Sequence, residues 1–263
     1  MANWNTTDIK SWNELDKDFY WHQGYFHVNY EGNENYQRDW DEQRLRDYAV
    51  FTLGELKGKT ILDMGCGYGL YSLTFLMMGA ELVCGQDIDK EALDKAISIM
   101  EKFNFKYKVG DCAEIQYEDN YFDLVFAGDL FEHVTLNKKK DFISEAYRVL
   151  KPGGIFTIKT PNKSYLKITN LLHRIKAIIK FRNPFNIHIA HTRNNPDNEH
   201  HGLTTHKELI GLFEETFFHK PEITTSDFNK NLPRWICRIL SKYRLNAQIT
   251  ISVTKPIFYG IYQ

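Results

Sequence analysis

The sequence is poor in cysteine and has no long apolar run. Its 263 residues include four cysteines, none of them in a C-x-x-C pair, so neither a zinc ribbon nor a thioredoxin-like redox site is indicated. No stretch approaches the roughly 20 apolar residues that a membrane-spanning helix needs. Residues 1–10 are polar and lack the apolar centre of a secretion signal. We therefore expect a cytoplasmic protein with reduced cysteines and no transmembrane segment.

The net charge is also small, at −1, but it is unevenly distributed. Residues 1–60 carry 7 basic and 11 acidic groups, residues 61–162 carry 11 and 16, and residues 163–263 carry 15 and 7. The carboxyl-terminal third therefore has a net charge of +8. Such an excess indicates either a solvated basic face or a surface that meets an anionic partner.

From residue 60 onward, short apolar strands alternate with helical segments, which predicts βαβ units and a parallel sheet. Strands are expected at Thr60–Met64, Glu81–Gly85, Tyr107–Val109, Phe122–Ala127, Gly154–Thr160, Ile249–Thr254 and Ile257–Tyr262. Helical spacing of apolar residues is found at Leu70–Met78, Lys90–Phe103, Asp141–Leu150 and Thr204–Phe217.

The chain divides into four parts on this pattern. Residues 1–57 are rich in aromatic side chains and have helical spacing over Trp40–Leu56, so they are expected to form a helical cap or lid. Residues 58–162 hold the strand–helix alternation. Residues 163–203 interrupt it with a basic amphipathic segment and a loop rich in proline, asparagine and histidine. Residues 204–263 are expected to close the sheet.

A glycine-rich loop follows the first expected strand, with the sequence Asp63-Met64-Gly65-Cys66-Gly67-Tyr68-Gly69. Glycines at such a turn let the backbone bend tightly and approach a ligand closely. Asp87 ends the second strand, where a ribose diol needs a carboxylate acceptor. Asp111 follows the third strand, where a further loop would meet an adenine.

These segments together resemble the class I methyltransferases that use S-adenosylmethionine (SAM). The resemblance rests on ILDMGCGYG, GQDID, GDCAEI, FDLVFAGDLFEHV and VLKPGGIFTIKTPN, in that order, over roughly residues 50–162. It points in particular to the branch of quinone-biosynthesis and small-molecule O-methyltransferases. Nicotinamide dehydrogenases usually space their glycines as G-x-G-x-x-G instead. The resemblance implies an α/β fold: a Rossmann-like, seven-stranded, mostly parallel sheet with helices on both faces, an N-terminal helical cap and a helical insert after strand five.

The resemblance also implies which residues hold SAM. At the methionyl end, Asp63 and the backbone of Gly65 would bind the amino group, Gly67 and Gly69 would complete the loop, and Asp129 would border the site.

At the adenosine end, Asp87 would accept both ribose hydroxyls and Ile88 would pack on the adenine. Asp111 would accept the adenine amino group, and the backbone of Cys112 would contact a ring nitrogen. The alternative is that these acids cap helices or lie in exposed loops.

Histidines supply candidate bases for the transfer. A methyl transfer to a hydroxyl needs a group that takes the proton, and His133 follows strand four at the edge where ligands bind. The alternative is that His133 anchors its loop. His200 and His201 are further candidates at the acceptor. The spacings of His188, His191, His200, His201 and His206 match no metal-site motif, so no metal is expected.

The acceptor is expected to be a small molecule bound by Tyr20, Tyr25, Arg193 and Arg234. The basic third favours an anionic compound, such as a phosphate-bearing or nucleotide-linked intermediate of surface-polysaccharide biosynthesis. A quinone precursor at a membrane surface is the alternative, since amphipathic segments suit peripheral contact. Nucleic acid is not expected, because Ala127-Gly128-Asp129-Leu130 stands where base methyltransferases carry an Asn/Asp-Pro-Pro-aromatic turn. A non-catalytic SAM-binding subunit is also consistent with the motifs, and no oligomeric state is predicted.

Overall fold

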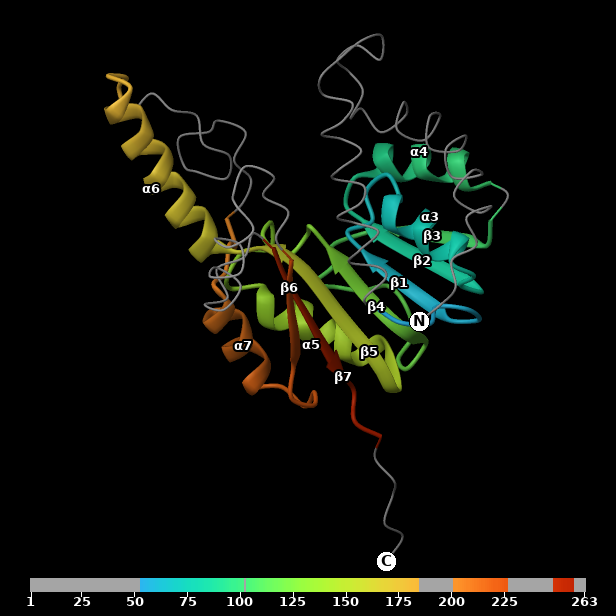
Figure 1. Cartoon of the computed structure of the whole chain (residues 1–263). Coiled ribbons are helices and arrows are strands. Elements are labelled where there is room, and N and C mark those ends of the chain that lie inside the picture. The colour runs from blue at the N-terminus through green and yellow to red at the C-terminus, as the bar shows by residue number, and fades with distance from the viewer. Residues whose placement is uncertain (1–52, 102, 185–200, 227–247, 258–263) are drawn as a thin grey trace, which may run out of the picture. The chain divides into compact units, whose positions relative to one another are not determined.

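The computed structural model describes residues 53–101, 103–184, 201–226 and 248–257, which belong to two compact units (Figure 1). The boundary between the units lies between Val109 and Gly110. The first unit contains β1 (Thr60–Met64), α3 (Leu70–Met77), β2 (Leu82–Asp87), α4 (Lys90–Met100) and β3 (Phe105–Val109). The second contains β4 (Phe122–Gly128), α5 (Lys139–Val149), β5 (Leu150–Pro161), α6 (Lys163–Ile179), α7 (His206–Glu214), β6 (Glu222–Ser226) and β7 (Gln248–Thr254).

The strands form one seven-stranded sheet in the order β3-β2-β1-β4-β5-β7-β6. Strand β2 pairs in parallel with β1 and β3, and β4 pairs in parallel with β5. Strand β7 is antiparallel to both of its neighbours, β5 and β6. The mostly parallel seven-stranded sheet predicted from the sequence is therefore confirmed.

In the first unit, an apolar strand and an amphipathic helix account for the core. Four of the five residues of β1 are buried, as expected for a parallel strand covered on both faces. Helix α4 begins at Asp89, whose side chain accepts a hydrogen bond from the Ala92 amide. Its buried face consists of Ala92, Leu93, Ala96 and Met100.

In the second unit, aromatic side chains fill the space beside β5. Phe156 of β5 packs against Phe142 of α5 and Phe213 of α7, and Phe218 closes the cluster. The residues of α5 that face this core are spaced as an amphipathic helix requires, namely Phe142, Ile143, Ala146 and Val149.

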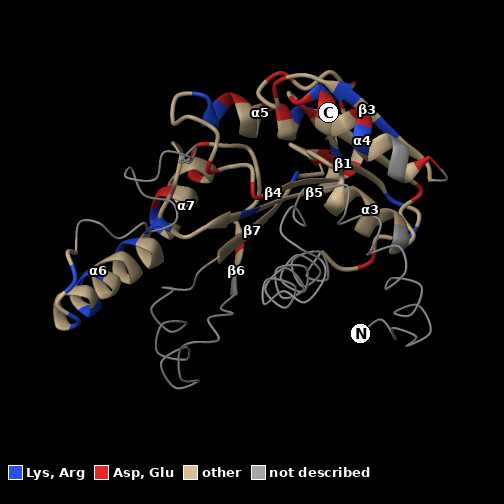
Figure 2. Cartoon of the chain, turned by 90° about the horizontal axis from the view of Figure 1, so that it is seen from above, with Lys and Arg blue, Asp and Glu red and all other residues tan. Residues whose placement is uncertain are grey.

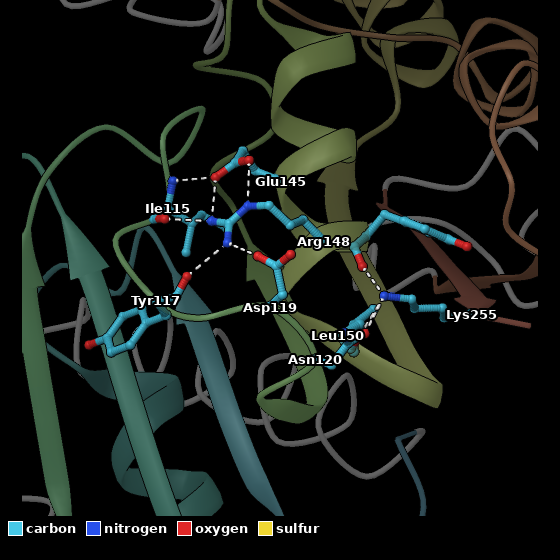
Figure 3. A network of polar contacts seen from close by, with 9 residues as sticks. Ile115, Tyr117, Asp119, Asn120, Glu145, Arg148, Leu150 and Lys255 are labelled. Atoms are coloured by element: carbon cyan, nitrogen blue, oxygen red, sulfur yellow. Dashed lines mark hydrogen bonds and ion pairs between the residues drawn. The ribbon is translucent and has the colours of Figure 1, made fainter. Parts of the chain in front are cut away.

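A polar network ties the loop between β3 and β4 to the carboxyl end of α5 (Figure 3). The Arg148 guanidinium donates to the carbonyls of Ile115 and Tyr117 and to the carboxylates of Asp119 and Glu145. Because Glu145 also accepts from the Ile115 amide, one charged pair satisfies several backbone groups of the loop. The loop that begins at Gly110 is therefore fixed at its far end.

Two expectations at the ends of the chain were wrong. The helix expected over Trp40–Leu56 does not extend through its last residues, because Gly54 has a φ of 81° and residues 54–56 are not helical. The strand expected over Ile257–Tyr262 does not include Ile257, and its remaining residues lie outside the described part. The strand beside β7 is β6 instead, whose Glu222–Ser226 segment has little apolar character. None of the described helices is long and apolar enough to span a bilayer.

Candidate functional site

The glycine-rich loop lies between β1 and α3 and uses left-handed backbone at three glycines. The φ angles of Gly65, Gly67 and Gly69 are 66°, 49° and 79°. The loop is closed by hydrogen bonds from the Gly65 amide to the Gln86 carbonyl (2.8 Å) and from the Gly69 amide to the Cys66 carbonyl (2.7 Å). A Cβ on Gly69 would overlap only the movable end of the Met100 side chain, so the left-handed φ is what favours glycine here. Such a loop at a helix N-terminus presents backbone amides to a ligand.

Asp63 is the buried acid of this loop. Its side chain is 1% exposed, and its Oδ2 accepts a hydrogen bond of 2.7 Å from the Ser72 hydroxyl. Burial raises the pKa of Asp63 to about 7; the Ser72 hydrogen bond opposes this shift, and the nearby Asp87 carboxylate adds to it. A carboxyl group that ionises near neutral pH is suited to bind a cationic group, because the cation stabilises the charged form.

Asp87 joins the end of β2 to the glycine loop. Its Oδ2 accepts from the Gly67 amide (2.8 Å) and its Oδ1 from the Asp89 amide (2.9 Å). A carboxylate has about four acceptor positions, so these two bonds leave capacity for a diol. The next residue, Ile88, is 74% exposed. A partly exposed carboxylate followed by an exposed apolar side chain matches what a ribose and an adenine need.

In the second unit, the loop after β3 places Asp111 in an ion pair. The Asp111 carboxylate accepts a hydrogen bond from Lys138 Nζ (2.6 Å) and another from the Ala113 amide (2.9 Å). The hydrogen bond from Lys138 lowers the pKa of Asp111. The side chains of this pair are about half exposed, at 43% for Asp111 and 53% for Lys138. Cys112 beside it is buried. Lys138 was not predicted, because in the Lys138-Lys139-Lys140 run it resembles an ordinary surface lysine.

Asp129 follows β4 in a strained conformation. Its φ is 55°, a left-handed value that is uncommon for residues other than glycine. Its amide donates to the Lys159 carbonyl (3.0 Å), and Lys159 Nζ lies 2.6 and 2.7 Å from its two carboxylate oxygens. Lys159 is buried, whereas the Asp129 side chain is 37% exposed. Strain of this kind persists where surrounding contacts over-determine it, and it is enriched at functional sites.

Glu132 and His133 are neighbours in the turn after β4 and differ in burial. Glu132 is buried and accepts a hydrogen bond of 3.0 Å from the Thr160 hydroxyl of β5. Burial, and secondarily the negative charge of Asp129, raise the pKa of Glu132 to about 7. His133 is exposed, and its amide donates to the Leu130 carbonyl (2.8 Å) in the turn after β4. In this turn Glu132 is therefore a buried contact to β5, whereas the His133 side chain is exposed.

The buried side chain of Lys139 contacts the backbone of the same turn. Lys139 is fully buried, and its ammonium donates to the Phe131 carbonyl (2.6 Å) while lying 3.3 Å from the centroid of the Phe131 ring. Burial lowers the pKa of Lys139 to about 7, an effect that Lys163 increases and Glu132 opposes. No sequence pattern indicates this role, because Lys139 lies in a run of three lysines that is typical of a solvated surface.

The segment at residue 202 closes over this turn. The Gly202 amide donates to the Glu132 carbonyl (2.7 Å), and a Cβ on Gly202 would overlap the Val134 carbonyl. Because Glu132 and Gly202 are joined by this backbone hydrogen bond, their neighbours His133 and His201 belong to adjoining segments. Both histidines are exposed. Two of the three histidines predicted for the acceptor thus lie next to residues that are hydrogen-bonded to each other, and their roles at the acceptor stay predictions.

The other predicted acceptor residues lie outside the described residues, namely Tyr20, Tyr25, Arg193, His200 and Arg234. Within the described part, no group of three or more histidine, cysteine, aspartate or glutamate side chains is arranged to hold a metal ion. The three described cysteines, Cys66, Cys84 and Cys112, form no disulfide bond and are buried.

Comparison with known proteins assigns the central part of the chain. Residues 62–158 match the family model described as methyltransferase domain. A ubiquinone biosynthesis O-methyltransferase from Coxiella burnetii is 32% identical over 112 residues, which cover 42% of this chain and 47% of that protein. A sterol 24-C-methyltransferase from Saccharomyces cerevisiae is 30% identical over 119 residues, which cover 44% of this chain and 30% of that protein. The chain thus spans less than half the length of these curated relatives.

The fold has a counterpart among solved structures. A SAM-dependent methyltransferase from Archaeoglobus fulgidus superposes with a TM-score of 0.56 at 19% identity, covering 81% of this chain and 94% of that one. The shared feature is the seven-stranded fold, because identity at this level carries no information on the acceptor.

Proposed function

We propose that the chain is a class I, SAM-dependent enzyme that transfers a methyl group to an oxygen atom of a small-molecule acceptor. The match of residues 62–158 to the methyltransferase domain family supports this proposal. The observation that carries the proposal is the geometry around Asp87. A left-handed glycine loop, a carboxylate bonded to that loop and an exposed isoleucine follow one another as the adenosine of SAM requires.

The cofactor contacts that we propose follow this geometry. Asp87 accepts the ribose hydroxyls and Ile88 covers the adenine, while Asp63 and the backbone of Gly65 bind the methionyl amino group. In the second unit, Asp111 and the backbone of Cys112 serve the adenine ring. The intact glycine loop and the raised pKa of Asp63 support this assignment, since a cationic amino group offsets the cost of the buried charge.

His133 is the proposed base. The cofactor supplies an activated methyl group, so the remaining task is to orient the acceptor hydroxyl and remove its proton. SAM would supply the methyl group already activated, and the His133 imidazole would take the proton of the acceptor hydroxyl. Two observations support this role: the exposed imidazole after β4, and the buried Glu132, Thr160 and Lys139 that hold its turn. Asp129, held by Lys159, and His201 border the acceptor in the same proposal.

The acceptor class that we favour is anionic. The net charge of +8 over residues 163–263 supports a phosphate-bearing or nucleotide-linked compound, for which Arg193 and Arg234 are the proposed ligands. The O-methyltransferase among the relatives supports oxygen as the target, although a carbon methyltransferase of similar identity shows that the domain alone does not decide this.

The test begins with SAM binding measured by calorimetry. The Asp87→Ala variant should bind SAM about 10- to 100-fold more weakly, since it loses charge-assisted hydrogen bonds. Asp94→Ala is the matched control, because Asp94 is an exposed aspartate of α4 that pairs only locally with Lys90. Equal affinities of the two variants would contradict the cofactor assignment.

Turnover is then measured as release of S-adenosylhomocysteine with panels of sugar phosphates, nucleotide sugars and phenols. We expect methylation of a hydroxyl in one of these classes, at a rate about 10- to 100-fold lower with Asp87→Ala at limiting SAM. Product formed only with nucleic acid would overturn the small-molecule proposal. Tight SAM binding without product from any acceptor would make the chain a non-catalytic SAM-binding subunit.

A further inference from the structure

Helix α6 turns its apolar side away from the protein. At about 100° per residue, Leu171, Leu172, Ile175, Ile178 and Ile179 fall within an arc about 120° wide. We call these five side chains the apolar arc. The opposite side of the helix carries Ala177, the one buried side chain of α6 in the described structure. A helix that covers a core has the reverse arrangement, with its apolar stripe inward.

The exposure of the apolar arc is unusually large. Its members are 59%, 54%, 43%, 60% and 71% exposed in chain order. Phe181, directly beyond the helix, is fully exposed. Figure 1 shows α6 extending from the end of β5 away from β7 and α7. Contiguous exposed apolar surface of this kind marks an interaction site.

Helix α7 of the same unit shows what a core helix of this chain looks like. Its Leu209 and Phe213 are buried, and Phe213 packs on Phe156 of the sheet. A full capping box formed by Thr205 and Glu208 fixes its start. Helix α7 therefore buries its apolar side, whereas α6, which is longer and more apolar on one side, does not.

Basic side chains border the apolar arc on both sides. Lys167 and Arg174 fall on one side of it, and Lys176 and Lys180 fall on the other. Residues 163–183 include no aspartate or glutamate, so the whole helix is cationic, as the blue segments of α6 in Figure 2 show. Long basic side chains at the border of an apolar stripe can reach anionic headgroups while their stems stay on apolar surface.

We propose that α6 binds the surface of an anionic lipid bilayer, with the apolar arc at the acyl boundary and the flanking basic residues at the headgroups. An apolar stripe with lysine and arginine at its edges is the pattern of helices that lie in the membrane interface. Charge complementarity decides between this occupant and a second copy of the chain. Two α6 helices packed by a two-fold axis would bring only like charges together, whereas an anionic surface neutralises them.

The contact is peripheral. Helix α6 has 17 residues with basic groups along its length, and it does not meet the requirements of a membrane span. The inference does not rest on the proposed methyl transfer, because binding to lipid needs neither SAM nor an acceptor. It implies that the acceptor site of the second unit works next to a membrane surface.

The experiment uses the full chain and sedimentation with vesicles, either of phosphatidylcholine alone or of phosphatidylcholine and phosphatidylglycerol in equal parts. We expect binding to the mixed vesicles and at least about tenfold weaker partitioning to the neutral ones. The Leu171→Ser/Ile178→Ser variant should lose at least about tenfold in partitioning, since it removes two apolar side chains from the lipid boundary. Leu136→Ser/Ile257→Ser is the matched control, because Leu136 and Ile257 are 66% and 53% exposed outside α6, and it should bind as the parent does.

Charge is tested separately. Lys176→Gln/Lys180→Gln should weaken binding to the mixed vesicles by about fivefold per residue. Lys207→Gln/Lys220→Gln changes the net charge equally at exposed positions elsewhere and should have a smaller effect. Equal loss in the variant and control of either pair would overturn the proposal. It would also be overturned by a chain that dimerises without lipid and becomes monomeric in Leu171→Ser/Ile178→Ser.

Discussion

The two groups of candidate residues, around the glycine loop and after β4, are built in opposite ways. The first is local in sequence: it runs from Asp63 to Asp89, and its acids accept hydrogen bonds from backbone amides and a serine hydroxyl of the same stretch. The second joins β4, β5 and α5 through buried lysines that contact an acid or a carbonyl, and a backbone hydrogen bond adds the segment at residue 202. In our proposal the contiguous loop binds the cofactor, which is the same for every acceptor. The group after β4 takes its charged side chains from several elements, so single residues can be substituted to suit a different acceptor.

The comparison also separates the electrostatics of the two groups. The raised pKa of Asp63 comes mainly from burial with few charges nearby, so a bound cation is its natural partner. The group after β4 contains charges of both signs. Lys159 forms an ion pair with Asp129, and the charge of Glu132 opposes the lowering of the Lys139 pKa. Variants in the two groups should therefore affect different measurements.

The largest expected effect lies after β4. His133→Gln should lower kcat by about 10²- to 10⁴-fold, because it removes the proposed general base, while SAM affinity stays unchanged. The measurement combines steady-state turnover with calorimetry of SAM. The control is His219→Gln, an exposed histidine beyond α7 that should be silent in both. Turnover close to that of the parent would assign His133 to the structure of the turn.

A smaller effect, of about tenfold per pH unit, is expected at the glycine loop. In our proposal the ammonium of SAM binds Asp63 in its ionised form, and burial raises the pKa of Asp63 in the free protein to about 7. Below pH 7 the carboxyl group is protonated, so the SAM affinity should fall as the pH drops from 7 to 5. Asp63→Asn should show weak binding without this slope. An identical slope in both proteins would show that another group titrates.

The stability of the SAM-free protein should change in the opposite sense. Burial raises the folded-state pKa of Asp63 to about 7, above the ordinary range of an aspartate, so this group favours the folded state most at low pH. Its contribution is lost as the pH rises towards 7. Asp63→Asn should remove that part of the pH dependence in denaturant unfolding.

The smallest effect concerns stability after β4. Lys159→Met should lower the free energy of unfolding by about 1–3 kcal/mol, because it removes the buried ammonium that binds both carboxylate oxygens of Asp129. Lys151→Met provides the matched control: Lys151 is also in β5 and pairs with Asp123 of β4, but it is 42% exposed and should cost less than about 1 kcal/mol. A double-mutant cycle with Asp129→Asn isolates the pair. Equal losses at the two lysines would contradict the distinction between the two ion pairs.

Sequence reasoning predicted the parts of the fold that depend on local pattern. Strand β1 was expected at Thr60–Met64 and is found there, and β4, α4 and α5 differ by a few residues at their ends. Strand β6 was missed, because Glu222–Ser226 is polar and becomes a strand only through pairing with β7. The fifteen residues from Asp63 to the end of α3 suffice to indicate a glycine turn, whereas no local pattern indicates a long-range contact.

The candidate residues follow the same division. The acids of the glycine loop were identified by their spacing, although their roles as ligands stay predictions. The supporting lysines were not identified, because a sequence does not tell a buried Lys139 or Lys159 from a solvated one. Burial of a cation depends on what the rest of the chain places around it, here Phe131 and Asp129.

The antiparallel strand β7 has a consequence for how the chain is synthesised and folds. It pairs with β5 on one side and with β6 on the other, so Gln248–Thr254 completes both edges at once. Its partner positions in β5 are Ile155–Pro161, roughly ninety residues earlier, and such distant pairings are slow to form. Until β7 leaves the ribosome, the edge of β5 that β7 will cover is unpaired. Most residues of β5 are buried in the folded protein, so this exposed edge is a site for aggregation. Truncation just before residue 248 should therefore reduce solubility more than its length alone suggests.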